Sequence, residues 1–277
     1  MASFLISTDD LAADLNAPDL RIVDASWHLD GGDARAEFDQ ARIPGAVFFD
    51  LDAVSDHTSD LPHMLPDAAA FAKAAGALGI AASDRIVVYD SQGLFSAARV
   101  WWTFRLMGAE DVRVLDGGLP RWRAEGHPLA SGSAETPRLA VFVTSPRPGA
   151  VVDMPTVLAA LSGDAQIIDA RPAARFSGEA TEPRPGLRSG HMPGALNLPF
   201  KSVLDADGRL LPAEALRDRF RQAGVTFDRP IITSCGSGVT AAILTLALAE
   251  LGEDSALYDG AWAEWGGRSD TPVTTGP

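Results

Sequence analysis

The sequence contains one cysteine, Cys235, among its 277 residues. A single thiol excludes an internal disulfide and any metal site built from several cysteines. Positive charge is also scarce, because 23 Lys and Arg residues stand against 37 Asp and Glu residues, for a formal net charge of -14. So acidic a chain lacks the positive field that holds a phosphate backbone, and we expect no nucleic-acid partner.

Long apolar runs are missing too. No stretch reaches the roughly 20 apolar residues that a membrane-spanning helix needs, and the opening "MASFLISTDD" lacks the charged and apolar regions of a signal peptide. We therefore expect no membrane partner and a cytoplasmic location, where a lone thiol stays reduced. With 46% hydrophobic and 22% charged residues, the composition is that of a folded globular protein long enough for two domains.

What the sequence does contain is a duplication. Four segments of the first half recur in the same order in the second half. The pairs are RIVDASW (21–27) with QIIDARP (166–172), RIPGAVFFDL (42–51) with HMPGALNLPF (191–200), RIVVYDSQG (85–93) with PIITSCGSG (230–238), and VLDGGLPRW (114–122) with LYDGAWAEW (257–265). We therefore expect two similar domains, at residues 1–130 and 151–277. Residues 131–150, rich in Ser, Pro, Thr and Gly, are predicted to be the linker.

Both halves have the pattern of an α/β fold. Short β-branched runs such as RIVVYD (85–90) and PIITS (230–234) lack a clean alternation of apolar and polar residues, as expected of strands buried on both faces of a parallel sheet. They alternate with helical stretches, and those at residues 67–79 and 239–252 each end at a glycine. We expect each half to be a mostly parallel sheet with helices on both faces.

Cys235 falls where a predicted buried strand ends and a glycine-containing loop opens onto a helix. Open α/β sheets place their ligands at this edge. The backbone N–H groups that follow can curl around the sulfur and, with the positive end of the helix, stabilise a thiolate or a bound sulfur anion. The residues that supply them are Gly236, Ser237, Gly238, Val239 and Thr240. This context favours a nucleophile.

The sequence bears on three particular roles for Cys235. A free cysteine is often a small buried hydrophobe. A cysteine phosphatase needs an arginine six residues after the cysteine, where this sequence has Ala241. A redox sensor needs a second cysteine to resolve a sulfenic acid, and the chain has none.

At this point the residues resemble a known family, the tandem-domain sulfurtransferases of the rhodanese superfamily. The resemblance covers essentially the whole chain. The loop CGSGVTA (235–241) is similar to that of members that use 3-mercaptopyruvate, whereas members that use thiosulfate carry basic residues where Gly236 and Ser237 stand. The amino-terminal domain of the family is catalytically inactive, and here Asp90 replaces the cysteine.

The resemblance also implies site residues. It places the substrate carboxylate on Arg175 and Arg184, and it pairs Asp52 and His63 with the loop serine, Ser237. Arginine suits a carboxylate because its planar fork binds both oxygens. A histidine can accept or relay a proton near neutral pH, and a loop serine can donate to the substrate carbonyl.

One position departs from the family pattern, since a further basic residue is expected at Ser177. The spacing of the two arginines is nevertheless kept. The remaining histidines (His28, His57, His127 and His191) have no ligand-like spacing, so we expect no metal and no cofactor.

The function implied is transfer of sulfur from 3-mercaptopyruvate to Cys235 as a persulfide, with release of pyruvate. A small thiol, thioredoxin or cyanide would then accept the sulfur. Two alternatives stay open: a thiosulfate:cyanide sulfurtransferase, and a rhodanese-like binding module whose thiol is idle.

Overall fold

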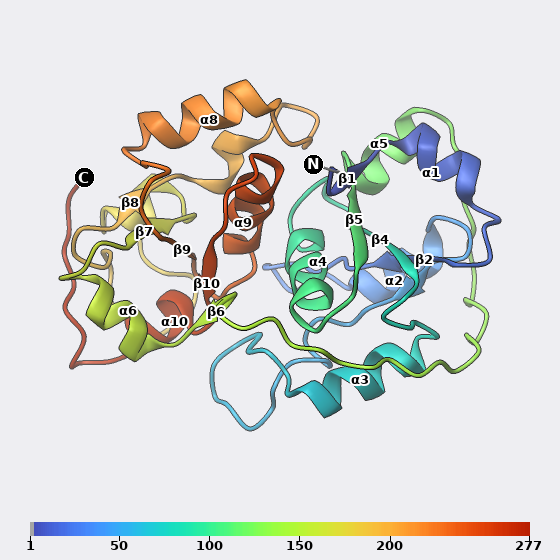
Figure 1. The fold of residues 1–277 in the computed structure, drawn as a ribbon, viewed down its shortest axis with the longest axis horizontal. Coiled ribbons are helices and arrows are strands. Elements are labelled where there is room, and N and C mark those ends of the chain that lie inside the picture. Colours follow the sequence, from blue (N-terminus) through green and yellow to red (C-terminus); the bar gives the residue numbers. More distant parts are fainter. Residues whose placement is uncertain (1–2) are drawn as a thin grey trace. The chain divides into compact units, whose positions relative to one another are not determined.

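A computed structural model of the chain describes residues 3–277, which divide into two compact units (Figure 1). Unit 1 holds the described residues up to Asp56, together with Leu65–Arg147 and Ala206–Leu210. Unit 2 holds His57–Met64, Pro148–Asp205 and Leu211–Pro277. Each unit therefore contains a short segment from the other half of the sequence.

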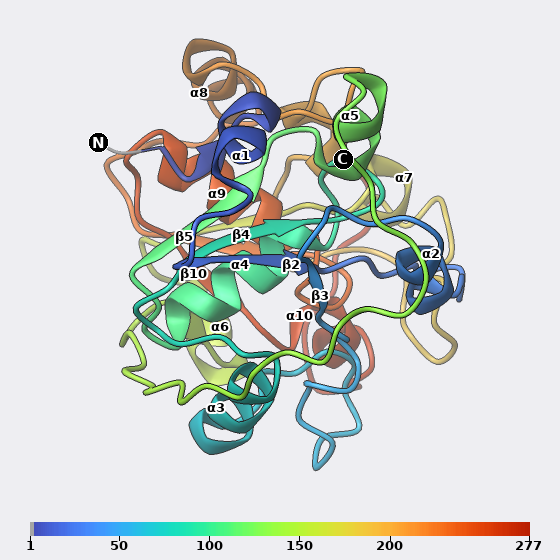
Figure 2. The same ribbon diagram turned by 90° about the vertical axis from the view of Figure 1, so that its right-hand side faces the viewer.

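Unit 1 is built on a five-stranded sheet in the order β1-β5-β4-β2-β3, and all its strand pairs are parallel. The strands are β1 (Leu5–Ile6), β2 (Leu20–Asp24), β3 (Val47–Phe48), β4 (Arg85–Tyr89) and β5 (Asp111–Leu115). The helices are α1 (Thr8–Asp14), α2 (Ala34–Gln40), α3 (Ala68–Ala77), α4 (Ala97–Leu106) and α5 (Gly118–Ala124). Figure 2 shows α1 and α5 on one face of this sheet and α3 and α4 on the other.

Unit 2 repeats this plan with a five-stranded parallel sheet in the order β6-β10-β9-β7-β8. The strands are β6 (Val151–Val152), β7 (Gln166–Asp169), β8 (Leu196–Asn197), β9 (Ile231–Ser234) and β10 (Ala256–Tyr258). The helices are α6 (Met154–Ala160), α7 (Ala173–Phe176), the 3-10 helix η1 (Phe200–Val203), α8 (Ala213–Gln222), α9 (Ala241–Glu250) and α10 (Ala261–Trp265).

The two strand orders match position by position, so the duplication and the α/β fold expected from the sequence are confirmed. The β-branched runs lie in the central strands because parallel strands are covered on both faces. All residues of β7 and of β9 are buried.

Local sequence signals set where several helices begin. Ser7, Asp33, Asp67 and Asp153 precede α1, α2, α3 and α6, and each side chain accepts a hydrogen bond from a backbone N–H of the first turn. Helix α9 has no such cap, and its residues up to Leu248 are buried. Its sequence is apolar on nearly all sides because the helix is buried between other elements.

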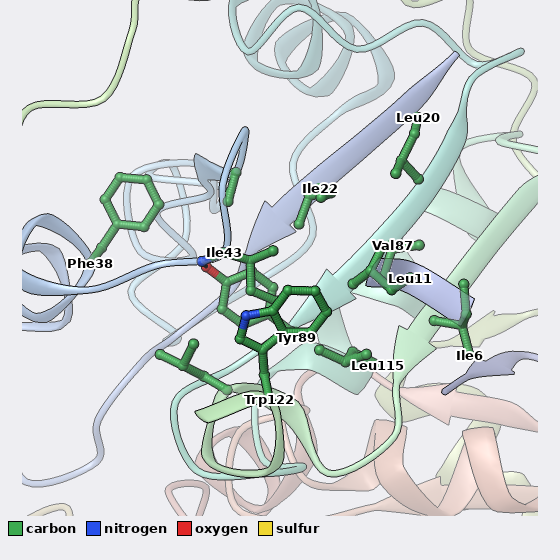
Figure 3. Close-up of a cluster of buried hydrophobic side chains, with 12 residues drawn as sticks. Ile6, Leu11, Leu20, Ile22, Phe38, Ile43, Val87, Tyr89, Leu115 and Trp122 are labelled. Atoms are coloured by element: carbon green, nitrogen blue, oxygen red, sulfur yellow. Dashed lines mark hydrogen bonds between the residues drawn. The ribbon is translucent and has the colours of Figure 1, made fainter. Parts of the chain in front are cut away.

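The core of unit 1 gathers around the central strands (Figure 3). Val87 and Tyr89 of β4 pack with Ile22 of β2 and Trp122 of α5, all at most 4% exposed. Burying an apolar side chain of this size contributes about 1.5 to 3 kcal/mol. In unit 2, Trp262 and Trp265 of α10 are fully buried with Tyr258, which fixes α10 on its sheet.

Residues 131–150, predicted to be the linker, contain no helix or strand, and part of the segment packs on unit 1. The N–H of Ala140 donates to the carbonyl of Gly76 at 3.0 Å, and the buried ring of Phe142 meets Phe71 edge to face at 5.2 Å. A Cβ on Gly76 would lie 2.6 Å from the Ala140 oxygen, so this close approach requires glycine.

No helix among residues 3–277 is both long and apolar enough to cross a membrane.

Candidate active site

The loop that carries Cys235 joins β9 to α9 and is fixed by the start of α10. The N–H of Trp262 donates to the Cys235 carbonyl, and the N–H of Ala263 donates to the Gly236 carbonyl, both at 2.9 Å. Cys235 is 2% exposed and Ser237 is 6% exposed. The thiol therefore sits at the carboxyl end of the sheet, on backbone anchored by a buried helix.

The two glycines of this loop are needed for different reasons. Gly238 has φ +76, a left-handed conformation that other residues rarely adopt. Gly236 has no such φ. A Cβ there would lie 3.0 Å from Nη2 of Arg175, so Gly236 leaves room for a guanidinium rather than for an unusual backbone.

The corresponding loop of unit 1 shows what this kind of loop binds. Its Asp90 stands where unit 2 has Cys235, and its carboxylate accepts four backbone N–H bonds. Oδ2 accepts from Phe95, Ser96 and Ala97 at 2.7, 3.0 and 2.9 Å, and Oδ1 accepts from Gln92 at 2.9 Å. We call this set of N–H groups the amide cradle. The three donors to Oδ2 lie at the start of α4, where the helix dipole also favours negative charge.

A chain of alternating charges leads from β7 to Arg175. Arg171 donates to Asp169 at 2.6 Å and to Glu182 at 2.7 Å, and Glu182 also pairs with Arg175. The side chains of Asp169, Arg171 and Glu182 are at most 2% exposed, whereas that of Arg175 is 18% exposed. The chain thus presents one partly open guanidinium beside Gly236.

Arg171 is a fully buried cation that also stacks over the ring of Trp262, 4.2 Å from its centroid. Burial alone lowers its pKa, but the carboxylates of Asp169 and Glu182 outweigh this and raise the pKa above the ordinary value. Arg171 therefore stays charged and ties the charged chain to α10.

Neither Arg171 nor Glu182 is among the site residues predicted from the sequence. The signal that could have found Arg171 is its place two residues after the end of a buried strand, where ligands bind in such sheets. Glu182 sits two residues before Arg184 in a Pro/Gly-rich loop, and nothing in its sequence context marks it as buried.

Arg184 and His63 meet within unit 2, although 121 positions separate them in the sequence. Nη2 of Arg184 lies 3.1 Å from Nε2 of His63. His63 is 6% exposed and has φ +58, which is uncommon for a residue other than glycine. The segment His57–Met64 thus supplies unit 2 with a histidine from the first half of the sequence.

Unit 1 receives a segment in the corresponding place. Gly208 lies against Gly93 in the Asp90 loop, so close that a Cβ on Gly93 would be 3.3 Å from the Gly208 Cα. Asp52 also belongs to unit 1, and its Oδ2 accepts from Nε1 of Trp27 at 3.0 Å. Its pairing with His63 and Ser237 stays a prediction.

Two further predicted residues complete the loop of unit 2. Val239 is buried, and Thr240 stands at the N-cap position of α9 without a side-chain capping bond. In the amide cradle of unit 1, the counterparts of Thr240 and of the next two residues are the donors to Oδ2.

Among residues 3–277, no three His, Cys, Asp or Glu side chains form a group that could hold a metal ion.

Comparisons with known proteins agree with this architecture. Residues 7–125 and 154–268 each match the rhodanese-like domain family. The 3-mercaptopyruvate sulfurtransferase of Escherichia coli (strain K12) is 48% identical over 276 residues, which cover 98% of this chain and 98% of that protein. The mitochondrial thiosulfate/3-mercaptopyruvate sulfurtransferase 1 of Arabidopsis thaliana is 46% identical over 293 residues, covering 97% and 77%.

Among solved structures, the crystal structure of the 3-mercaptopyruvate sulfotransferase SseA from Escherichia coli superimposes with a TM-score of 0.86 at 44% identity, covering 94% of this chain and 99% of that one. Because both halves match the domain family and the relatives align over nearly the whole chain, this protein belongs to the tandem-domain sulfurtransferases of the rhodanese family.

Proposed function

We propose that Cys235 takes the sulfur of 3-mercaptopyruvate as a persulfide and passes it to a thiol acceptor. The observation that carries the proposal is the correspondence between Cys235 and Asp90. Both residues follow a buried central strand, and both precede a loop with a left-handed glycine, Gly238 or Gly93. In unit 1 the loop holds an anion that cannot leave, because it is part of the chain.

The carboxylate of Asp90 has the same connectivity as a cysteine persulfide. Its Cβ, Cγ and Oδ2 correspond to Cβ, Sγ and the outer sulfur of a loaded Cys235. By this correspondence, the outer sulfur accepts from the N–H groups of Thr240 and Ala241, the counterparts of two of the three donors to Oδ2. The N–H of Ala242, the counterpart of the third, donates to the Val239 carbonyl at 3.3 Å. Such an amide cradle stabilises a thiolate before transfer and the persulfide anion after it.

The first transfer needs no external oxidant or reductant. The Cys235 thiolate attacks the sulfur of mercaptopyruvate, and the S–S bond forms as the C–S bond breaks. The electron pair of the broken bond goes to the carbon, which leaves as the enolate of pyruvate and takes up the thiol proton of the donor. In the second transfer a thiol, thioredoxin or cyanide removes the outer sulfur and regenerates the thiolate.

Arg175 and Arg184 bind the donor carboxylate in this proposal. Arg175 borders the loop at Gly236 and is oriented by Glu182, while Arg184 is contacted by His63. Fixing the carboxylate aligns the donor sulfur with the thiolate and lowers the entropic part of the barrier. Ser237, buried in the same loop, donates to the carbonyl oxygen as the enolate develops.

The second candidate donor is thiosulfate, which the printed name of the Arabidopsis relative includes. Thiosulfate carries two charges near the sulfur that moves, and a basic loop would compensate them. Here Gly236 and Ser237 are neutral, so the loop itself carries no positive side chain beside the sulfur. The charge distribution therefore favours mercaptopyruvate, which has one negative charge farther from its sulfur.

The experiment is a comparison of the two donors with the same acceptor. We expect a higher kcat/KM for mercaptopyruvate, parallel lines in double-reciprocal plots, and loss of pyruvate release in Cys235→Ser. Equal or better turnover of thiosulfate would overturn the preference.

The relatives include a protein named as mitochondrial, so the cytoplasmic location stays a prediction. Fractionation of the source cells would test it.

A further inference from the structure

The contact between Arg184 and His63 fixes the protonation of the imidazole. A guanidinium carries only N–H donors and accepts no hydrogen bond. At 3.1 Å from Nη2 of Arg184, Nε2 of His63 must therefore be the acceptor. An imidazole that accepts at Nε2 is neutral and carries its proton on Nδ1.

The backbone and the burial of His63 hold the ring in this position. The residue adopts φ +58, a conformation that costs energy for a side chain with a Cβ. It follows Pro62, whose ring restricts the chain further, and its side chain is withdrawn from solvent at 6% exposure. Strained backbone that persists at a predicted site is a sign that one side-chain direction is required there.

We infer that His63 is a positioning residue, whose neutral imidazole orients Arg184 toward the carboxylate of the donor, rather than a group that relays protons. The inference rests on the proposed function and names a different role from the one the family resemblance implies for His63. The lone pair of Nε2 that would take a proton is occupied by the guanidinium. A neutral acceptor orients the arginine without offsetting its positive charge.

The test compares His63→Gln with His63→Phe. Glutamine can place an acceptor oxygen near the position of Nε2, but it cannot carry a proton between groups. Phenylalanine keeps the ring shape without an acceptor. We expect His63→Phe to raise KM for mercaptopyruvate about 10-fold or more with kcat changed much less, because one hydrogen bond to a charged group is lost. We expect His63→Gln to restore most of that loss.

A second readout separates positioning from proton transfer. Inorganic polysulfide donates sulfur but has no carboxylate, so the His63→Phe substitution should slow the loading of Cys235 from polysulfide much less than the loading from mercaptopyruvate. Equal losses of kcat in both variants, with KM unchanged, would overturn the inference in favour of a proton relay. If His63→Phe does not fold, the kinetics of His63→Gln decide alone. Failure of the unaltered protein to gain sulfur from mercaptopyruvate would instead overturn the proposed function.

Discussion

Nη2 of Arg175 lies 3.0 Å from the point that a Cβ on Gly236 would occupy. The guanidinium is held there by Glu182, so it cannot swing away without breaking a buried ion pair. This relationship links the loop of the nucleophile to the residue predicted to bind the substrate. It also explains why position 236 is a glycine, which the backbone conformation there does not require.

Gly236→Ala should therefore displace Arg175 while leaving Cys235 in place. We expect kcat/KM for mercaptopyruvate to fall about 10- to 100-fold, because misplacing a binding group by a fraction of an ångström disturbs alignment. Steady-state rates of pyruvate release at several mercaptopyruvate concentrations measure kcat/KM. Gly163→Ala is the matched control, since the nearest atom to its Cβ would be 3.5 Å away. An unchanged kcat/KM in Gly236→Ala would show that Arg175 has no part in binding the donor.

Glu182→Gln removes the charge that two arginines share. Arg171 and Arg175 then lose a buried partner, and breaking a buried pair typically destabilises a protein by about 3 kcal/mol or more. We expect a lower urea midpoint of unfolding and a higher KM for mercaptopyruvate. Glu179→Gln, an exposed position of the same loop, should change neither quantity. Wild-type stability in Glu182→Gln would contradict the role assigned to the charged chain.

Asp90→Ala empties the amide cradle of unit 1. Four N–H groups lose their acceptor, and buried unsatisfied groups cost about 1 to 3 kcal/mol each, so we expect a loss of at least about 2 kcal/mol in unfolding free energy. Loading of Cys235 with sulfur should persist in the folded variant. The control Asp33→Ala removes a helix cap that accepts one N–H bond. A smaller loss for Asp90→Ala than for this control would show that the cradle is not what Asp90 stabilises.

Asp24 gives the fold a pH dependence of known sign. Burial raises its pKa above the ordinary 3.8, and the neighbouring charge of Asp90 adds to the effect. The folded state thus binds the Asp24 proton more tightly than the unfolded chain. This stabilisation is fully present below pH 3.8 and is lost as the pH rises through the higher native pKa.

Asp24→Asn should therefore be more stable than the unaltered protein at neutral pH, and the difference should shrink on acidification. Asparagine keeps an oxygen for the bond from the Ser26 N–H, which Asp24 Oδ1 accepts at 2.9 Å. Thermal unfolding midpoints over a pH series measure the effect. If the difference in unfolding midpoint between Asp24→Asn and the unaltered protein grew toward low pH, the pKa of Asp24 would be lowered by folding and not raised.

The fold was predictable because its signals are local. The central strands are β-branched runs without alternation, and the duplication repeats them in order. The placement of Cys235 followed from the strand before it and the glycine loop after it.

The charged chain could not be predicted in this way. A glutamate in a polar loop ordinarily points to solvent, and only the tertiary structure shows that Glu182 is buried between two arginines. The delivery of His63 to unit 2 is likewise a property of the folded chain, because no local pattern marks residues 57–64 as part of the second unit.

The central claim is that Cys235 carries the transferred sulfur, and intact-protein mass spectrometry tests it most directly. The protein is incubated with 3-mercaptopyruvate in the absence of an acceptor, alongside Cys235→Ser. Because the chain has one cysteine, a persulfide can form at no other residue. We predict a mass increase of one sulfur atom for the unaltered protein, reversed by a small thiol, and none for the variant. No increase in the unaltered protein, or an equal increase in both, would contradict the account and leave Cys235 as an idle thiol of a binding module.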